Sequence, residues 1–353
     1  MIRIILIMLI TFYCSQNAVY AIGKWVKTAE SINRYYMDAS AYDTMHCAAL
    51  SNFGYMYGRL ELSDDGGNTW RQVLKYKDIF LDPENLGGPI RLISLDYPSP
   101  NLIICGGTGT WILRSTDQGE TWTRSRIDSV ENEIIRLRMN NDNFGAAITL
   151  HELYTTTDRG ASWKKFDTMP FNSEKVYFRD LSLTPNSDSK AIVSFSYGSF
   201  DTTYYFVTKD CGKTWGLLKQ YKYSFSKMFF IDSLLGFSWE SYPTGKGDAD
   251  KIRKTTDGAQ TWTLLMDTII TPAMQLKGIY FLNKEYGMYW GNWGKILVTR
   301  DGGLTVQQEY LPDYPTGYDL SAGIILSENN RLLFSTSGEI FRYENTVGTD
   351  EDF

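Results

Sequence analysis

Cysteine and histidine are scarce in this chain, and their scarcity argues against two kinds of protein. The 353 residues include four Cys and two His. Beyond the N-terminal segment the cysteines are Cys47, Cys105 and Cys211, an odd number spread along the chain, which does not make a disulfide framework. A cysteine nucleophile is not expected either, because only His46 and His151 are present to activate one.

Long apolar runs are also missing, apart from one short stretch at the N-terminus. Residues 1–3 include Arg3, residues 4–12 are apolar, and residues 19–21 end in small side chains, an order typical of a signal peptide over residues 1–21. The apolar stretch is too short to span a bilayer, so we expect no transmembrane segment. Cys14 lies in a poor context for lipidation. We therefore expect an exported protein, periplasmic or extracellular, without a lipid anchor.

The chain has no excess of basic residues. Lys and Arg number 35 against 41 Asp and Glu, which gives a net charge of −6 at pH 7. Proteins that bind nucleic acid usually carry a strongly basic surface. Nucleic acid is therefore not expected as a partner.

What the chain has in abundance is one octapeptide, Ser/Thr-x-Asp-x-Gly-x-Thr-Trp, which we call the box. Its copies span residues 63–70, 115–122, 156–163, 208–215, 255–262 and 299–306. The last two copies are altered, because Ala259 replaces the Gly and Val306 replaces the Trp. The side chains expected to hold these turns are Asp65, Trp70, Asp117, Trp122, Asp158, Trp163, Asp210, Trp215, Asp257, Trp262 and Asp301.

Each part of the box suits a tight turn between two strands. The carboxylate accepts hydrogen bonds from backbone N–H groups further round the turn, and the hydroxyl does so more weakly. The Gly supplies a positive φ at little cost, and the Trp places apolar surface beneath the turn. The acidic residues around Asp65 do not have the spacing of a calcium-binding EF-hand loop. We therefore expect the box residues to be structural, with no metal and no cofactor.

The spacing of the boxes predicts a β-propeller. Successive box Asp residues lie 41 to 52 residues apart, and a further step from Asp301 reaches Asn345, at the end of a decayed seventh copy. Repeats of about 40–50 residues with several short strands are typical of propellers. The sequence thus predicts an all-β, seven-bladed β-propeller with four-stranded antiparallel blades over residues 22–345, followed by a short acidic tail at 346–353.

The two ends of the chain are predicted to close the ring. Residues 24–27 resemble the Trp-led strands that follow the other boxes. The seventh copy, in contrast, has no Trp-led strand after it. We expect residues of about 24–30 to pair antiparallel with residues of about 338–344, because this pairing completes the last blade and leaves no free sheet edge.

The boxes resemble those of the bacterial neuraminidase repeat, or Asp-box, superfamily. The longer pattern at residues 279–303 is similar to that of propellers of the photosystem II stability and assembly-factor type, and the resemblance covers nearly the whole expected mature chain. It implies a seven-bladed, non-enzymatic module for binding or assembly. Propellers of the sortilin type and sialidases share the box.

The alternative is an enzyme, a sialidase-like or other glycoside hydrolase. Resemblance to sialidases implies three Arg around a substrate carboxylate, for which the planar guanidinium is well suited. The Arg-Ile-Pro signature of those enzymes is absent, because Pro89-Ile90-Arg91 has the reverse order. Glycosidases with paired carboxylates in this superfamily use two propellers, and this chain has the length of one. The sequence leans toward a binding or scaffold protein, with a purely structural envelope role as a third option.

Candidate binding residues lie on the face opposite the boxes. Because strands alternate in direction within a blade, inner-strand starts share that face with the loops between second and third strands. Arg91, Arg136 and Arg179 are expected near three inner-strand starts. Two arrangements are open. Either each Arg pairs with a local acid such as Asp96 or Asp180, or the three Arg together form an anion-binding or catalytic cluster.

Aromatic residues are expected on the same face. They are Trp239, Tyr242 and Trp293, which either pack between blades or form a platform for a sugar or a peptide. We expect a protein, peptide or glycan ligand on this face, bound by a monomer.

Overall fold

The computed structural model describes the chain over most of its length. The described residues are 23–30, 33–53, 57–74, 90–129, 132–140, 143–167, 175–184, 189–222, 227–244, 247–268, 276–312 and 317–344. The expected signal peptide at 1–21 and the expected tail at 346–353 lie outside them. No helix of the described residues has the length and apolarity of a membrane span.

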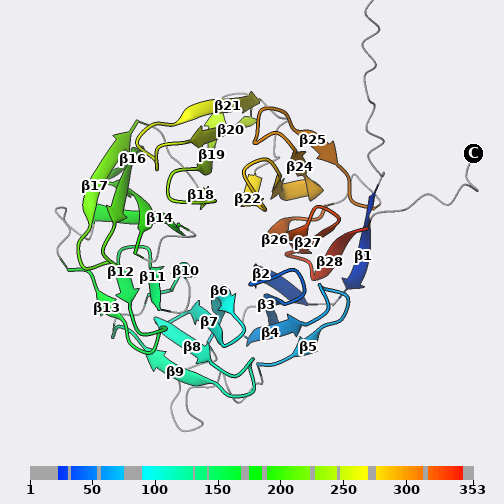
Figure 1. Cartoon of the computed structure of the whole chain (residues 1–353), viewed down its shortest axis with the longest axis horizontal. Helices are drawn as coiled ribbons and strands as arrows, with labels where there is room; N and C mark the ends of the chain where they lie inside the picture. Colours follow the sequence, from blue (N-terminus) through cyan, green and yellow to red (C-terminus); the bar gives the residue numbers. More distant parts are fainter. Residues whose placement is uncertain are drawn as a thin grey trace, which may run out of the picture.

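The described strands form seven four-stranded antiparallel sheets arranged as blades around a central channel (Figure 1). This confirms the predicted seven-bladed β-propeller. Each blade runs from an inner strand at the channel to an outer strand. Blades 1 to 3 contain β2 (Arg34–Ala41), β3 (Cys47–Phe53), β4 (Tyr57–Ser63), β5 (Arg71–Gln72); β6 (Leu92–Ser99), β7 (Leu102–Gly107), β8 (Trp111–Ser115), β9 (Thr123–Arg126); β10 (Arg136–Asn140), β11 (Phe144–Ile148), β12 (Leu153–Thr156) and β13 (Lys164–Lys165).

Blades 4 to 7 have the same order of strands. They contain β14 (Val176–Leu183), β15 (Ala191–Tyr197), β16 (Ser199–Thr208), β17 (Gly216–Tyr221); β18 (Lys227–Phe230), β19 (Gly236–Thr244), β20 (Gly247–Thr255), β21 (Thr263–Thr268); β22 (Leu276–Phe281), β23 (Gly287–Gly291), β24 (Ile296–Thr299), β25 (Gln307–Glu309); β26 (Leu320–Ser327), β27 (Asn330–Ser335), β28 (Glu339–Glu344) and the N-terminal β1 (Lys24–Glu30). A 3₁₀ turn, η2 (Asn292–Gly294), joins β23 to β24.

The core of the molecule lies between the blades. Second strands such as β7 and β11 are buried along their whole length, because a neighbouring blade covers each of their faces. The outer strand β9 is mostly exposed and carries polar residues. Fully burying one Leu, Ile or Phe side chain contributes about 1.5–3 kcal/mol, so the inter-blade layers supply most of the stability.

The box turns have one hydrogen-bond pattern. At Asp117, Thr121 donates its backbone N–H to Oδ1 at 2.9 Å and its hydroxyl to Oδ2 at 2.5 Å. The hydroxyl of Ser115 donates to Asp117 Oδ1 and accepts the N–H of Gly119, both at 2.8 Å. The same bonds recur at the other five boxes, around Asp65, Asp158, Asp210, Asp257 and Asp301.

The box Gly is needed for more than its φ. Gly119 has a φ of 83°, and a Cβ built on it would lie 2.7 Å from the side chain of Val73 in the preceding blade. Glycine therefore allows each turn to lie directly on its neighbour. In the fifth box Ala259 occupies this position with a φ of 74°, a conformation that is strained for alanine.

The box Trp residues differ in burial. Trp215 is 8% exposed and packs in the core between blades 3 and 4. Trp122 is only partly buried, and its indole N–H donates to the carbonyl of Gly119 at 3.1 Å. Trp122 therefore contacts its own turn and also packs against the edge of a core cluster.

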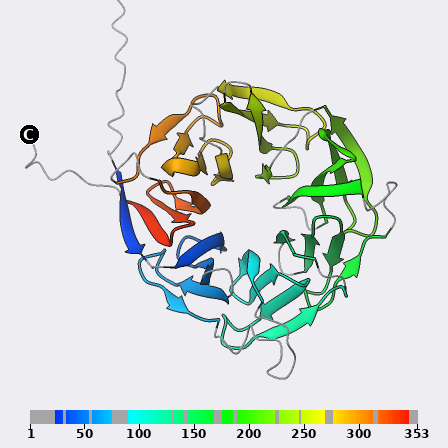
Figure 2. The same ribbon diagram turned by 180° about the vertical axis from the view of Figure 1, so that it is seen from behind.

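The ring closes through the N-terminal strand, as predicted. β1 pairs antiparallel with β28, from Lys24 opposite Glu344 onward, and the two strands lie side by side in the reverse view (Figure 2). Trp25 is 3% exposed and donates its indole N–H to Glu309 of blade 6 at 2.7 Å. The fully buried Arg331 of blade 7 binds the same carboxylate at 2.9 Å. This cluster ties β1 to two blades.

Removing β1 is expected to open the ring. A chain that lacks all residues through Lys27 should lose more than the roughly 3–5 kcal/mol that deletion of a buried Trp alone costs. Urea unfolding followed by tryptophan fluorescence measures this loss. A chain that lacks only residues through Ala21 retains β1 and serves as the control. Equal stability of the two shortened chains would contradict the role of β1 in closure.

The box residues should differ in their effect on stability. Trp215→Ala should reduce the free energy of unfolding by roughly 3–5 kcal/mol, since it leaves a large cavity. Asp117→Ala should cost about 1–3 kcal/mol, because it removes the acceptor for the N–H and hydroxyl of Thr121. Trp122→Ala should cost less than Trp215→Ala. Chemical denaturation of the three variants checks this order, and the reverse order would refute it.

Candidate functional site

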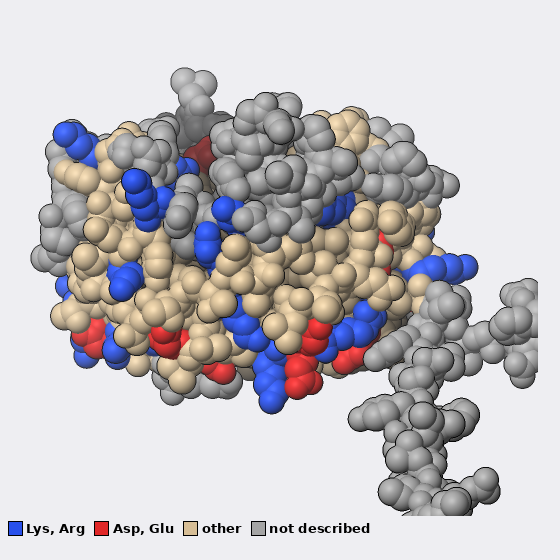
Figure 3. All heavy atoms as spheres, turned by 90° about the horizontal axis from the view of Figure 1, so that it is seen from above, with Lys and Arg blue, Asp and Glu red and all other residues tan. Residues whose placement is uncertain are grey.

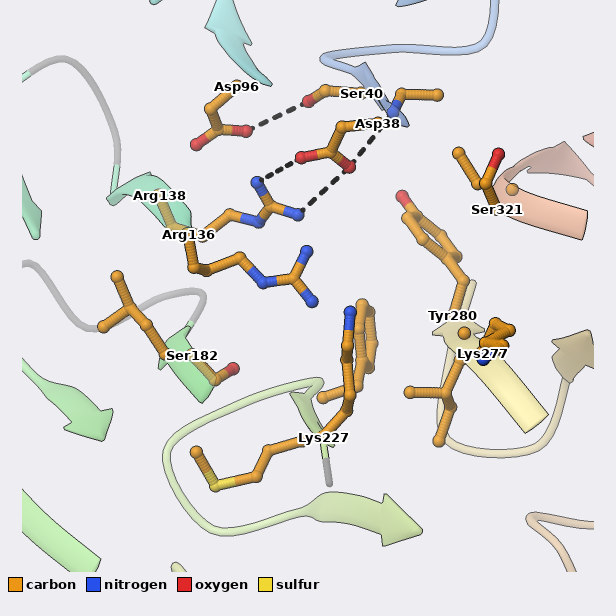
Figure 4. Close-up of a pocket in the computed structure, with 18 of the residues that line it drawn as sticks. Asp38, Ser40, Asp96, Arg136, Arg138, Ser182, Lys227, Lys277, Tyr280 and Ser321 are labelled. Carbon is orange, nitrogen blue, oxygen red and sulfur yellow. Dashed lines mark hydrogen bonds and ion pairs between the residues drawn. The ribbon is translucent and has the colours of Figure 1, made fainter. Parts of the chain in front are cut away.

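The central channel contains a cavity of about 290 Å³ that is lined by residues from all seven inner strands (Figure 4). Its polar lining residues come from blades across the whole ring. They are Asp38, Ser40, Asp96, Arg136, Arg138, Ser182, Lys227, Lys277, Tyr280 and Ser321. The cavity is therefore assembled from segments far apart in the sequence.

Three carboxylates in and beside the cavity each tie one blade to the next. Asp38 accepts the backbone N–H of Leu95 at 3.1 Å. Asp96 accepts that of Met139 at 2.6 Å, and Asp180 of blade 4 does the same for Met228 at 2.6 Å. Each acid thus satisfies a buried N–H at the start or middle of the next inner strand, where an unpaired donor would be costly.

Two Arg side chains of β10 neutralise two of these acids. Arg138 binds Asp38 at 3.1 Å, and Arg136 binds the buried Asp180 through Nε at 2.9 Å. Burial disfavours the charged form of Asp38, but the nearby charges of Arg138 and Arg136 outweigh it and hold its pKa below the usual value. Burial raises the pKa of Asp96, which no Arg binds directly.

Lys227, the first residue of β18, projects into the cavity without a partner. Among the described residues, its ammonium has no hydrogen-bond acceptor and no carboxylate within ion-pair distance. The positive charge of Arg136, followed by burial, lowers the pKa of Lys227 to about 8. It is the one strongly shifted amine in the cavity lining that the structure describes.

Of the residues proposed from the sequence, the structure brings Arg136 and Trp239 to the cavity. Arg136 pairs with Asp180, one of the two acids suggested for it. Trp239 is 1% exposed, and its indole N–H donates to the carbonyl of Leu276 at 3.2 Å. Trp239 therefore forms part of the cavity wall and has no free hydrogen-bond donor.

The other proposed residues are not part of the cavity lining. Arg91 binds Glu133 at 2.6 Å, in a surface pair. Arg179 lies in the middle of β14 and donates from Nε to the hydroxyl of Ser196 at 3.3 Å. Trp293 is 50% exposed in η2, and the side chain of Tyr242 lies outside the described residues.

Sequence reasoning missed Lys227, Arg138 and Lys277. Lys227 and Arg136 each open an inner strand, so a base at the first position of β10 and β18 was the available signal. Arg138 follows two residues after Arg136, and alternation along a strand places both on the same side. Which side chains of an inner strand face the channel depends on the register of that strand, and the sequence alone does not show the register.

On the side of the disc that Figure 3 shows, the charged side chains of the described residues are mixed or scattered. In the edge-on view, acidic and basic side chains mix along the lower rim, and scattered basic ones predominate above it (Figure 3). Among the described residues no group of His, Cys, Asp and Glu has the arrangement of a metal site.

The fold and the cavity define a seven-bladed β-propeller with a polar, positively charged channel. A family model described as sortilin, neurotensin receptor 3, matches residues 110–233. No curated protein matches the sequence significantly.

Solved structures share the fold at low identity. YCF48 bound to D1 peptide is 17% identical with a TM-score of 0.67, covering 94% of this chain and 98% of that one. YCF48 from Cyanidioschyzon merolae is 14% identical with a TM-score of 0.64, covering 91% and 98%. A GH74 xyloglucanase from Xanthomonas campestris is 14% identical with a TM-score of 0.62, covering 90% of this chain and 53% of that one. At these identities the likeness shows the fold alone.

Removal of Asp180 should show how much the channel depends on its paired charges. Asp180→Asn leaves Arg136 without its carboxylate beside Lys227, and breaking a buried pair in this way costs roughly 3–5 kcal/mol. Glu133→Gln, which breaks the surface pair with Arg91, should cost at most about 1 kcal/mol. Urea unfolding compares the two variants. Similar losses of unfolding free energy in both variants would show that the Arg136–Asp180 pair contributes no more to stability than a surface pair.

Proposed function

We propose that this protein is an exported binding propeller that holds a protein or peptide at the mouth of its channel, on the face opposite the box turns. The observation that carries the proposal is the position of polar and basic side chains in the cavity lining. Arg136, Lys227, Lys277 and Ser321 are each the first or second residue of an inner strand. Because the strands of a blade alternate in direction, these starts lie at the end of the channel away from the boxes.

Exposed apolar side chains on the same face support a peptide ligand. Phe53, Leu150 and Trp293 lie at or in loops between second and third strands and are 52%, 44% and 50% exposed. Apolar anchors around a cationic channel suit a peptide that carries both hydrophobic and acidic side chains. The likeness to a propeller solved with a bound peptide is in keeping with this ligand class. The signal-peptide pattern over residues 1–21 is the basis for export.

A glycan, bound or hydrolysed, is the second candidate, and the likeness to a xyloglucanase favours it. Hydrolysis by inversion needs two carboxyl groups that flank the sugar with room for a water. In the cavity, Asp38 and Asp96 each hold a backbone N–H of the next blade, and Asp38 is also paired with Arg138. These bonds support structural roles for both acids, and therefore binding over catalysis.

Capture of partners by the immobilised chain tests the proposal. The bait is exposed to exported proteins of the source cells, and captured proteins are identified by mass spectrometry. Replacing Arg91 by Ala and Trp293 by Asn, which tolerates the positive φ there, should weaken the captured complex at least tenfold, or about 1.4 kcal/mol. Leu304→Ala, at an exposed site in a box turn, should leave binding unchanged.

Two further measurements separate the peptide-binding candidate from the glycan candidate. Added salt should weaken a complex that depends on the cationic face. A fluorogenic glycoside panel, run in parallel, should show no turnover. Hydrolysis that disappears in Asp96→Asn would instead establish the glycosidase, and capture that survives the Arg91 and Trp293 changes would place the ligand on another face.

A further inference from the structure

The channel contains two cations that face each other without an acid between them. Arg136 of blade 3 uses its Nε for Asp180, and its two Nη atoms have no acceptor among the described residues. Asp180 gives one oxygen to Arg136 and the other to the N–H of Met228, and Lys227 makes no hydrogen bond or ion pair with either oxygen. Figure 4 shows the guanidinium of Arg136 and the ammonium of Lys227 pointing toward the same open space.

Two of the three carboxylates around this space are already paired with Arg side chains. The groups that face Lys227 are Arg136 and Arg138 from β10, Asp180 from β14, Asp38 from β2, Asp96 from β6 and Lys277 from β22. Arg138 neutralises Asp38, and Arg136 neutralises Asp180. Asp180 and Asp38 attract the charge of Lys227, but the repulsion of Arg136 and burial outweigh that attraction, and no carboxylate of the described residues pairs with Lys227 directly.

We propose that this space is a binding site for an oxyanion, a sulfate, phosphate or carboxylate group, held between Lys227 and Arg136. The planar fork of Arg136 can present both Nη donors to one such group, and the ammonium of Lys227 adds a charge-assisted bond. The cavity of about 290 Å³ has ample room for an anion that replaces a few waters of about 30 Å³ each. The proposal concerns the interior of the channel and does not depend on the macromolecular ligand proposed above.

Two properties of the unliganded protein follow from the arrangement. Arg136 lowers the pKa of Lys227 to about 8, so the charged amine is disfavoured in the folded state. Between that pH and the ordinary value near 10.5 the unfolded chain binds more protons, and the stability of the folded chain rises with pH. An anion in the site should reverse this effect, because it stabilises the charged amine.

Sulfate is the probe, since its charge does not change between pH 6 and pH 10. Isothermal titration calorimetry at millimolar sulfate, with ionic strength held constant by chloride, should give one site on the wild-type chain. Lys227→Met should abolish this binding and raise the melting temperature without sulfate, because it removes a cation that no carboxylate of the described residues pairs with. Lys219→Met removes a similar charge from the exposed strand β17 and should bind sulfate as the wild type does.

The pH dependence gives a second readout on the unaltered protein. Sulfate affinity should be constant below pH 7 and fall by about tenfold for each pH unit above 8, since binding must then take up a proton. NMR of lysine side chains should show the midpoint of Lys227 moving upward when sulfate is added. Acetate in place of sulfate distinguishes a carboxylate ligand from an inorganic oxyanion by which of the two binds more tightly.

Failure of both anions to bind, equal binding by Lys227→Met, or an unmoved midpoint for Lys227 would overturn the proposal. These outcomes are independent of partner capture. A chain that binds sulfate and captures no protein would refute the proposed function alone, and a chain that captures a protein and ignores both anions would refute the channel site alone.

Discussion

A propeller is stable only as a closed ring, and here closure depends on one antiparallel pairing between the two ends of the described chain. Each blade buries its faces against two neighbours, so an open ring would expose the inner layers of both blades at the break. β1 prevents this by completing the blade formed by β26 to β28. Trp25, Glu309 and Arg331 add a buried cluster across the same seam, which fastens the N-terminal strand to blades 6 and 7. The positions of all inner strands, and hence of the channel, follow from this closure.

Within the ring, the two ends of the blades differ in structure and in role. At one end, the box turns are held by short-range bonds between side chains four residues apart or fewer, and their glycines lie against the preceding blade. The polar side chains of these turns are used in holding the turns together, so few of them are available to bind a ligand. At the other end, the inner strands begin and the loops between second and third strands vary in length and composition. The strand starts that carry Arg136 and Lys227, and the exposed Trp293, lie at this end.

The channel itself combines structural and functional chemistry. Asp38, Asp96 and Asp180 hold backbone N–H groups of neighbouring blades, and two Arg residues neutralise two of these acids. Burying charges is costly unless they are paired, which explains why the pairs are close and well oriented. Lys227 has no such partner among the described residues. A cation without a direct partner in a cavity is a cost to stability that a bound anion would remove, and this is the physical basis for assigning the cavity a ligand.

The sequence by itself determined the turns, the number of blades and the closure, because each of these depends on local patterns or on their spacing. A box forms its bonds within eight residues, and the Trp-led start of the chain indicated the strand missing from the last blade. Even the pairing of Arg136 with Asp180 was among the options read from the sequence. The membership of the channel was decided only by the tertiary structure. Bulges near Asp38 and Asp180 shift the inner strands by one residue, and such a shift changes which side chains face the channel. Lys227, Arg138 and Asp38 come together there from strands far apart in the chain, and no local sequence pattern predicts that they do so.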